Sequence, residues 1–449
     1  MNTQLLTKYD QPVPRYTSYP TLPFWDQSQP DVEIWKEKVI QAFEKDSAIS
    51  LYIHLPFCES LCTYCGCNKR ITKNHQVEDP YIESILKEWR MYLDLFPGKP
   101  MIREIHLGGG TPTFFAPERL QYLIENILKT TQTTDVVSFS FEAHPASTTY
   151  EHLKALRSCG FRRISLGVQD FSDQIMKVIN RFQTVAQIRQ VTEWARALDY
   201  ESVNYDLIYG LPFQTEENIR TNVALLKELR PDRIAFYSYA HVPWIKPSQR
   251  AYSETDLPDK YTKRKLYELG CDLLEAEGYV DIGLDHFALP SDELYIAMKA
   301  GSLHRNFMGY TPHSTRLSIG LGASSISDTW HAYAQNEKGI EKYQDRINAG
   351  EFPLIKGHFL NHTDQFVRQC ILDIMCRYQT SWQTPLREHP TLKASYDRLI
   401  NLANDGLIQF DDYSLEVTAL GKPFIRNICL ALDTHYWASK PQEQLFSKL

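Results

Sequence analysis

Six short runs of β-branched and aromatic residues alternate with stretches of helix length along the first half of the chain. The stretches between them carry apolar residues at helical spacing, as over residues 81–89 and 223–229. Alternation of this kind predicts a parallel sheet whose strands are joined by right-handed helical crossovers. The six expected strands cover residues 51–57, 102–107, 136–142, 163–168, 202–208 and 233–239.

Glycine-rich and polar residues follow several of these strands. Residues 108–113 (GGGTPT) come after the second strand, Gln169 and Asp170 after the fourth, and residues 210–212 (GLP) after the fifth. Barrel-type α/β folds build their sites at the carboxyl ends of strands. Because six units are present rather than eight, we expect an α/β fold with an incomplete (βα)6 TIM-like barrel, open on one side.

The strand–helix pattern weakens near residue 245, and from about residue 360 the chain is rich in helix. Two expected helices (365–378 and 392–404) precede an alternating hairpin (407–418), which resembles a winged-helix module. It lacks a basic recognition helix, so we interpret it as a lid or packing domain. We therefore expect an N-terminal arm over the active site (1–48), a partial barrel (49–245), a barrel extension with substrate-site elements (246–358) and a smaller, mainly helical C-terminal domain (359–449).

Composition narrows the possible functions. The chain of 449 residues has 48 basic and 55 acidic residues and a formal net charge of −7, which argues against a general nucleic-acid binder. No stretch of eighteen apolar residues occurs and the start lacks a cleavable leader, so we expect no membrane span. The nine cysteines are odd in number and four are clustered, which indicates a reducing compartment. We expect a cytoplasmic monomer.

The clustered cysteines directly follow the first strand, at Cys58, Cys62, Cys65 and Cys67. Zinc held by four thiolates fits the ligand count, but zinc sites usually consist of two separated pairs, and Cys65 and Cys67 are too close for one tetrahedral ion. A disulfide knot conflicts with a reducing compartment. A cluster held by Cys58, Cys62 and Cys65 leaves one iron open to a substrate or cofactor. The spacing therefore predicts an iron–sulfur cluster, with Cys67 as an outlier.

This three-cysteine spacing after a strand resembles the radical S-adenosylmethionine superfamily. The resemblance implies a 4Fe-4S cluster whose open iron chelates S-adenosylmethionine, and a 5′-deoxyadenosyl radical released after one-electron reduction. It also implies an electron-donor protein as a partner. The glycine run at residues 108–113 is consistent with it, because this superfamily places a glycine-rich turn against the methionyl amine.

Further runs, in order over residues 12–435, resemble one family, oxygen-independent coproporphyrinogen III oxidase. The resemblance implies anaerobic haem biosynthesis, in which the propionates on rings A and B of coproporphyrinogen III, a tetrapyrrole, become the vinyl groups of protoporphyrinogen IX. It also implies two molecules of S-adenosylmethionine. The runs lie at residues 14–21, 65–69, 107–113, 165–171, 206–212, 304–311 and 426–429.

The resemblance assigns residues to each of these molecules. Those at the cluster-bound molecule are Tyr52, Gly109, Glu142 and Ile326. Those at the second are Tyr64, Gly110, Thr111, Gln169, Arg181, Asp206 and Ala240. It also makes Cys67 part of the family's motif, and we expect Arg15 near a propionate. The residues alone leave other readings open: Glu142 as a helix cap, Arg181 as a solvated cation and Tyr52 as core packing.

One departure and two rival functions remain. Where the family has an acidic residue before a proline and a basic one after it, this chain has Ala143, His144, Pro145 and Ala146. His144 either replaces a polar contact or marks a different local geometry, which leaves room for a radical enzyme that modifies haem. The other rival is a haem-binding chaperone, against which Cys67 and the N-terminal run argue. Weaker candidates are His54, expected in the core, and two runs that are either propionate contacts or loop pairs, 285–287 and 304–306.

Overall fold

The computed structural model describes residues 3–26, 28–389 and 391–439, and the chain forms two compact units. The barrel unit comprises Gln29–Tyr295 and Thr315–Ile355, and the terminal unit comprises Met1–Ser28, Ile296–Ser314 and Lys356–Leu449. The expected four-part division stays a prediction, and its outer ends at residues 1, 2 and 440–449 lie outside the described residues. None of the described helices is long and apolar enough to cross a membrane.

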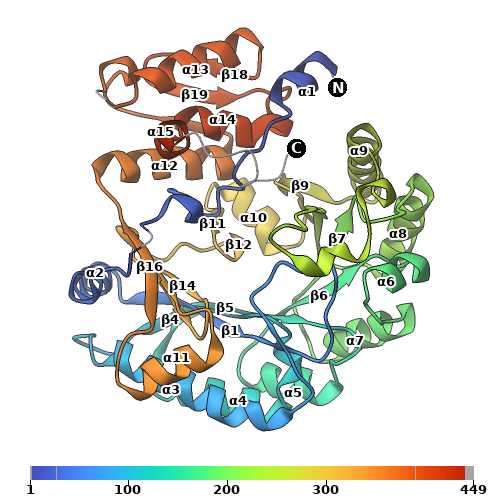
Figure 1. The fold of residues 1–449 in the computed structure, drawn as a ribbon, viewed down its shortest axis with the longest axis vertical. Coiled ribbons are helices and arrows are strands. Elements are labelled where there is room, and N and C mark those ends of the chain that lie inside the picture. The colour runs from blue at the N-terminus through green and yellow to red at the C-terminus, as the bar shows by residue number, and fades with distance from the viewer. Residues whose placement is uncertain (1–2, 27, 390, 440–449) are drawn as a thin grey trace. The chain divides into compact units, whose positions relative to one another are not determined.

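Six parallel strands form the centre of the barrel unit, and they match the six strands expected from the sequence (Figure 1). The six pair in parallel with one another, so the expected incomplete (βα)6 barrel is confirmed. In sheet order they are β1 (Ala48–Leu55), β4 (Met101–Gly109), β5 (Gln132–Ala143), β6 (Arg163–Gln169), β7 (Ser202–Tyr209) and β8 (Arg233–Ser238).

Helices follow the strands and line the outer side of the curved sheet (Figure 1). Three of them begin with a threonine in a capping box, Thr149, Thr184 and Thr215, in which the hydroxyl accepts from a free backbone N–H and stabilises the helix start. The helices are α3 (Glu78–Leu93), α4 (Pro117–Leu128), α5 (Tyr150–Ser158), α6 (Asp173–Val178), α7 (Val185–Ala197), α8 (Glu216–Leu229) and α9 (Lys260–Ala276).

The sheet continues beyond the six expected strands to a total of twelve. At one end β13 (Leu317–Leu321) pairs in parallel with β1, and β14 (Ile326–Asp328), β15 (Ala332–Asn336) and β16 (Leu354–Phe359) follow in that order. At the other end β10 (His286–Ala288) and β9 (Val280–Gly283) pair antiparallel. These strands have three to six residues each, too few to show a clear alternation in the sequence.

The segment expected as an N-terminal arm divides between the two units. Helix α2 (Val32–Lys45) belongs to the barrel unit, where it packs against β13 and β15 through the buried Trp35 and Val39. Helix α11 (Ile340–Asn348) lies in the same unit and packs against α3. Residues before position 29 belong to the terminal unit instead.

The terminal unit is smaller and mainly helical, with the expected small hairpin. Helix α14 (Ile425–Leu432) packs against α12 (His362–Arg377) and α13 (Lys393–Asn404). A small sheet has the order β17 (Gln379–Ser381), β19 (Ser414–Val417), β18 (Ile408–Phe410). The remaining elements are α1 (Thr3–Tyr9), α15 (Thr434–Ser439), the hairpin β11 (His304–Asn306) and β12 (Gly309–Thr311), and α10 (Glu293–Ala300), which spans the boundary between units.

Candidate functional site

The cysteine loop leaves the carboxyl end of β1 and is closed at its base. The short strands β2 (Phe57–Cys58) and β3 (Arg70–Ile71) pair in parallel and hold its two ends together. The turn after β4 joins it from the side, because the backbone N–H of Gly110 donates to the carbonyl of Leu55 at 2.8 Å and that of Thr111 to the carbonyl of Phe57 at 3.0 Å. The loop is therefore fixed to two strands of the sheet.

All four loop cysteines line one cavity of about 540 Å³. The hydrogen bond between Cys65 and Cys67 lowers the pKa of Cys65 to about 5 and raises the pKa of Cys67. Burial raises the pKa of Cys58 to about 11. Arg181 donates to the sulfur of Cys62 at 3.6 Å, and the ammonium of Lys69 donates to the carbonyl of Cys65 at 3.3 Å. Convergent thiols beside two cations suit an anionic iron–sulfur cluster.

The glycine turn after β4 approaches the first strand too closely for any side chain. Gly109 has a φ of +113°, and a Cβ there would lie 2.5 Å from the ring of His54. A Cβ on Gly110 would lie 2.6 Å from the carbonyl carbon of Pro56. His54 is buried, as expected, and its Nε2 lies 2.9 Å from the carbonyl oxygen of Asn68, so the ring also braces the far side of the cysteine loop.

Glu142 is the second-last residue of β5 and presents a carboxylate to the cavity. Burial alone would raise its pKa, but a hydrogen bond with His106 and another from the backbone N–H of Gly109, at 3.1 Å, outweigh it and lower the pKa of Glu142. His106 in turn stacks on Tyr52, with ring centroids 6.0 Å apart. Glu142 therefore does not cap the next helix; it is an ionised acceptor for a hydroxyl or amino group.

Arg181 is buried, with 6% of its surface exposed, which excludes the alternative of a solvated cation. Its guanidinium donates to the carbonyl of Gly167, to the side chain of Gln183 at 3.0 Å and to the hydroxyl of Tyr64 at 3.4 Å. These bonds fix the fork in the cavity wall. A fixed guanidinium of this kind is suited to bind a carboxylate.

Asp206 lines the same cavity from β7. Ser165 donates to one carboxyl oxygen at 3.1 Å and Asn204 to the other at 2.8 Å. Burial, followed by the charge of Glu142, raises the pKa of Asp206 to about 7. The two acids in one cavity therefore differ: Glu142 is held ionised, and Asp206 titrates near neutrality.

The structure brings most of the expected residues to this one cavity. They are Cys58, Cys62, Tyr64, Cys65, Cys67, Gly109, Gly110, Thr111, Glu142, Gln169, Arg181 and Asp206. Tyr52 lies behind the wall, where its hydroxyl is 3.0 Å from Nδ1 of His54. Ala240 is linked to the wall through Gln249, whose amide donates to the carbonyl of Ala240 at 3.0 Å and to that of Tyr64 at 3.4 Å.

Two further expected residues are not among those that line the cavity. Ile326 begins β14, and a Cβ on Gly320, the β13 neighbour of Tyr52, would lie 2.5 Å from the carbonyl oxygen of Ile326. Arg15 belongs to the terminal unit, and its contact with a propionate stays a prediction. The two weaker candidate runs belong to different units. Residues 304–306 lie in the hairpin β11–β12 of the terminal unit. In the run 285–287 of the barrel unit, His286 lies 3.5 Å from the hydroxyl of Tyr237.

His144, at the departure from the family pattern, also lines the cavity. Burial, with the nearby charge of Arg181, lowers the pKa of His144 to about 3, so the ring is neutral at physiological pH. Its Nδ1 accepts the backbone N–H of Ala146 at 3.1 Å. The proton therefore lies on Nε2, and His144 offers a neutral donor where an acidic residue was expected, while Ala146 stands where a basic one was expected.

His106, Ser165 and Lys69 also belong to the site, although no role was expected for them. Side chains two residues apart on a strand point to the same face, so counting back by two from Asp206 identifies Asn204. Ser165 requires the register of the sheet, in which it pairs with Glu142 and Asn204. Lys69 lies at the end of the motif run 65–69, but the run does not say what its side chain does.

Comparison with known proteins agrees with this geometry. The family model of the Radical SAM superfamily matches residues 52–226. An oxygen-independent coproporphyrinogen III oxidase of Synechocystis sp. is 37% identical over 100% of this chain and 97% of its own length. The protein of the same name from Escherichia coli is 35% identical over 99% and 97%. A solved structure, described as coproporphyrinogen III oxidase (HemN) from Escherichia coli and a radical SAM enzyme, has a TM-score of 0.89 at 33% identity and covers 97% of this chain and 99% of that one.

Proposed function

Because this chain belongs to the oxygen-independent coproporphyrinogen III oxidase (HemN) family of the radical SAM superfamily, we propose that it oxidatively decarboxylates coproporphyrinogen III. Each of two propionates loses a β-hydrogen atom, carbon dioxide and one further electron, which passes to an electron acceptor, and becomes a vinyl group. The product is protoporphyrinogen IX. The family implies a 4Fe-4S cluster and S-adenosylmethionine. When bound, these supply the radical that removes a hydrogen atom from the propionate β-carbon. The observation that carries the proposal is one cavity containing the cysteine loop, an ionised Glu142 and a buried Arg181.

Cys58, Cys62 and Cys65 are proposed to hold the cluster, with Cys67 outside it. Support comes from Arg181 at the sulfur of Cys62 and Lys69 at the carbonyl of Cys65, since nearby positive charge favours thiolates. Cys67 is the exposed member of the four. The raised pKa does not separate Cys67 from Cys58, whose thiol pKa is raised too. The exposure of Cys67 and its place outside the three-cysteine spacing are what suit it to a role toward substrate rather than iron.

Two molecules of S-adenosylmethionine are proposed in the cavity. Glu142 and the Gly109 turn are assigned to the cluster-bound molecule, together with Tyr52 and Ile326 beside them. For the second molecule, Arg181 provides the carboxylate partner, and Asp206 an acceptor for hydroxyl or amino groups. Gln169 and Tyr64 complete this side of the wall, and Ala240 lies behind Tyr64. A volume of about 540 Å³ is in the usual range of small-molecule sites.

The substrate carries four carboxylates, which need cationic partners in an acidic protein. Lys69 and Lys73 line the cavity and supply them from the barrel unit. Arg15 is proposed as a further propionate partner, and Cys67 as the catalytic thiol nearest the reacting side chain. The test is anaerobic incubation of the reconstituted, reduced protein with coproporphyrinogen III and S-adenosylmethionine. We expect protoporphyrinogen IX, carbon dioxide and 5′-deoxyadenosine.

A haem-related activity is the second candidate, favoured by the neutral His144 in place of a charged pair. This candidate is either a haem-binding chaperone or a haem-modifying enzyme, and the same assay, with haem added, distinguishes the two. Haem binding without turnover of coproporphyrinogen III would indicate a chaperone. Consumption of haem together with S-adenosylmethionine would indicate a haem-modifying enzyme. Either result contradicts the oxidase.

An acidic protein is proposed as the electron donor, and one surface of the barrel unit fits it. The lysine surface consists of Lys69, Lys246 and Lys338 around a cavity of about 490 Å³, with Leu61 and Ile71, 38% and 40% exposed, in its wall. Cys67 of the cysteine loop lines the same cavity, and Lys246 donates to the carbonyl of Gly66 in that loop at 2.7 Å. Local positive charge on a protein of net charge −7 guides an acidic partner, and exposed apolar residues favour contact. We propose that this protein acts as a monomer in the cytoplasm.

A further inference from the structure

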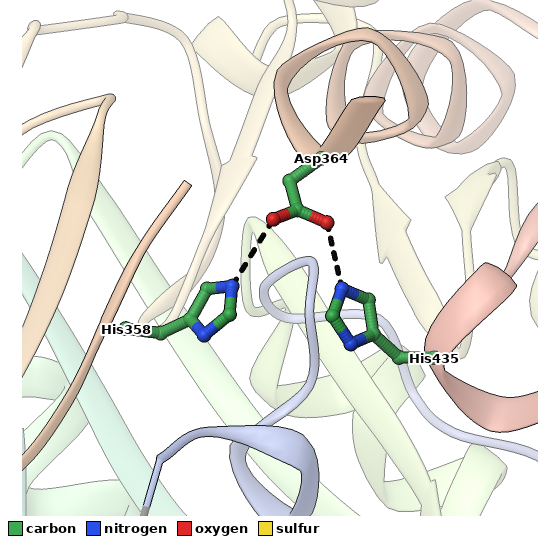
Figure 2. A group of neighbouring side chains, drawn as sticks. All are labelled: His358, Asp364 and His435. Carbon is green, nitrogen blue, oxygen red and sulfur yellow. Dashed lines mark hydrogen bonds and ion pairs between the residues drawn. The ribbon is translucent and has the colours of Figure 1, made fainter. Parts of the chain in front are cut away.

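Three side chains of the terminal unit converge far along the chain from the cysteine loop. His358 lies near the end of β16, Asp364 in the first turn of α12 and His435 in α15 (Figure 2). Nε2 of His358 is 3.2 Å from one oxygen of Asp364, and Nε2 of His435 is 2.6 Å from the other. One potential ligand atom from each residue lies within 4.8 Å of the other two. A small displacement would bring all three to a single ion.

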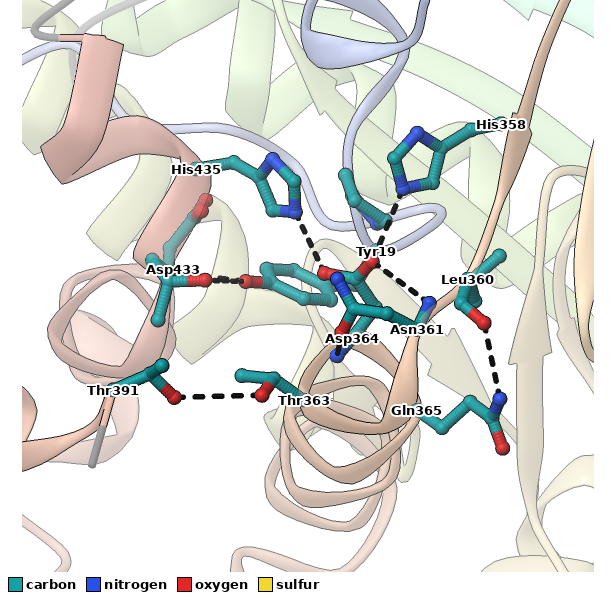
Figure 3. Close-up of polar contacts among 12 residues, drawn as sticks. Tyr19, His358, Leu360, Asn361, Thr363, Asp364, Gln365, Thr391, Asp433 and His435 are labelled. Carbon is teal, nitrogen blue, oxygen red and sulfur yellow. Dashed lines mark hydrogen bonds and ion pairs between the residues drawn. The ribbon is translucent and has the colours of Figure 1, made fainter. Parts of the chain in front are cut away.

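The carboxylate at the centre of the group is well defined. Its side chain is 2% exposed, and it also accepts the backbone N–H of Asn361 at 3.2 Å in the capping box that begins α12 (Figure 3). Its two oxygens face the ring nitrogens of His358 and His435. A buried carboxylate held in place between two ring nitrogens is therefore available as a ligand.

The second nitrogen of His358 points to the same chemistry. Within the described residues, the buried Nδ1 of His358 has no hydrogen-bond partner, and it lies 3.6 Å from a carboxylate oxygen of Asp26. Imidazoles that bind a metal usually donate their other N–H to a carboxylate. With the proton on Nδ1, His358 would face Asp26 in that way and direct the lone pair of Nε2 toward Asp364 and His435. This tautomer would point the Nδ1 proton at the carboxylate of Asp26, which would have to approach slightly to accept it.

We propose that His358, Asp364 and His435 form a binding site for a divalent transition metal, in the first place Zn²⁺. Two imidazole nitrogens and one carboxylate oxygen are ligands that Zn²⁺ accepts, with a fourth position left for water. The single negative charge of the set partly balances the ion. His435, with 27% of its side chain exposed, gives an ion access from solvent. The site connects β16, α12 and α15, and it does not depend on the proposed enzyme activity.

The test measures zinc in the full-length protein with its iron–sulfur cluster reconstituted. The protein is loaded with Zn²⁺, desalted and analysed for zinc per chain, and its affinity is measured by titration. We expect one zinc per wild-type chain, at least about hundredfold weaker binding for His435→Ala, and about tenfold weaker binding for Asp26→Asn, which removes only the orienting carboxylate. His362→Ala is the matched control, because His362 is an exposed histidine in the same helix as Asp364, and it should bind like wild type.

A second measurement, the Tm with and without Zn²⁺, identifies variants that have misfolded, and the Cys62→Ser variant identifies zinc bound in the cysteine loop. Zn²⁺ should raise the Tm of wild type and of His362→Ala, but not that of His435→Ala. If zinc instead occupies the cysteines, Cys62→Ser will lose it while His435→Ala keeps it. Retention of zinc by His435→Ala overturns the proposed zinc site. Loss of zinc from Cys62→Ser contradicts the iron–sulfur assignment of the loop. Wild-type protein without bound zinc after loading, or His435→Ala binding as tightly as wild type, also overturns the proposal.

Discussion

Cys67 differs from the three other loop cysteines in its surroundings. It is the exposed one of the four, and its hydrogen bond with Cys65 raises its pKa, whereas burial raises that of Cys58. Cys62 is buried and lies next to Arg181. We therefore expect Cys62→Ser to abolish the iron–sulfur cluster, and Cys67→Ser to keep it while product formation falls by at least about hundredfold, the lower end of the range for loss of a proton-transferring group.

Iron and sulfide content, together with the visible absorption of anaerobically reconstituted protein, checks this prediction. Both variants are compared with Cys159→Ser, which changes a buried cysteine outside the loop and should behave like wild type in cluster content. Loss of all cluster iron from Cys67→Ser would show that the division of the cysteines is wrong. Zinc without iron in wild type would contradict the cluster itself.

Asp206 makes the stability of the fold depend on pH. In the unfolded chain its carboxyl titrates near 3.8, but in the fold its pKa is raised to about 7 by burial and by Glu142. Between these values the folded protein keeps a proton that the unfolded chain releases, so this group's contribution to stability is lost as the pH rises. The wild type should lose about 3 kcal/mol relative to Asp206→Asn between about pH 5 and about pH 8.

Urea unfolding of both proteins at the two pH values measures this difference. Because the asparagine cannot ionise, only the wild type should show the pH-dependent term from this site. Parallel pH profiles would mean that Asp206 is ionised in the fold throughout. The variant should also bind S-adenosylmethionine more weakly, since an amide offers one acceptor oxygen in place of two.

At the scale of elements, the turn after β4 has almost no free space. A Cβ on Gly110 would lie 2.6 Å from the carbonyl carbon of Pro56, which is backbone and cannot rotate away. We expect Gly110→Ala to displace the start of the cysteine loop, to destabilise the protein by about 1–3 kcal/mol and to reduce cluster occupancy. Chemical unfolding and iron analysis test both effects.

Gly98→Ala is the matched control, because a Cβ there would meet no atom within 4 Å. It should change stability by less than about 0.5 kcal/mol, the usual range for surface substitutions. If Gly110→Ala behaves like Gly98→Ala, the turn has more freedom than its contacts indicate. The close approach of β4 to the cysteine loop would then not position the site.

The elements differ in how clearly the sequence predicts them. The six central strands were predictable because each is buried and rich in β-branched or aromatic residues, as in β1, where Ile49, Leu51 and Ile53 are fully buried. The short strands β13 to β15 were not, since three to five residues carry no measurable period. The same limit applies to the site: the motif residues follow strands and were identified, whereas His106 required the register of β4 against its neighbours.

At the scale of the whole molecule, the sequence could not show which distant segments associate. The terminal unit joins the first residues to the last through contacts such as Tyr16 to Asp433, at 3.0 Å, and Asn427 to the carbonyl of Tyr9, at 3.1 Å. These partners are separated by more than four hundred residues, and no local pattern encodes such a pairing. For the same reason α2, expected in an arm, belongs to the barrel unit.

The proposed docking of an acidic electron donor can be tested by reversing one charge on the lysine surface. Lys338 is exposed on the lysine surface, so Lys338→Glu reverses a charge there and leaves the cysteine loop's own residues unchanged. With an acidic flavoprotein as reductant, we expect cleavage of S-adenosylmethionine to slow by about tenfold at low ionic strength, because charge complementarity acts mainly on the rate of association. Added salt should reduce the difference, since it screens both proteins.

Dithionite separates docking from chemistry, because it reduces the cluster without a protein interface. With dithionite, Lys338→Glu should cleave S-adenosylmethionine at the wild-type rate. Lys154→Glu makes the same charge change on the exposed lysine of α5, away from the lysine surface, and should match wild type with either reductant. A loss of activity with dithionite would mean that Lys338 supports the site itself, and equal slowing by Lys154→Glu would mean that net charge, rather than this surface, guides the donor.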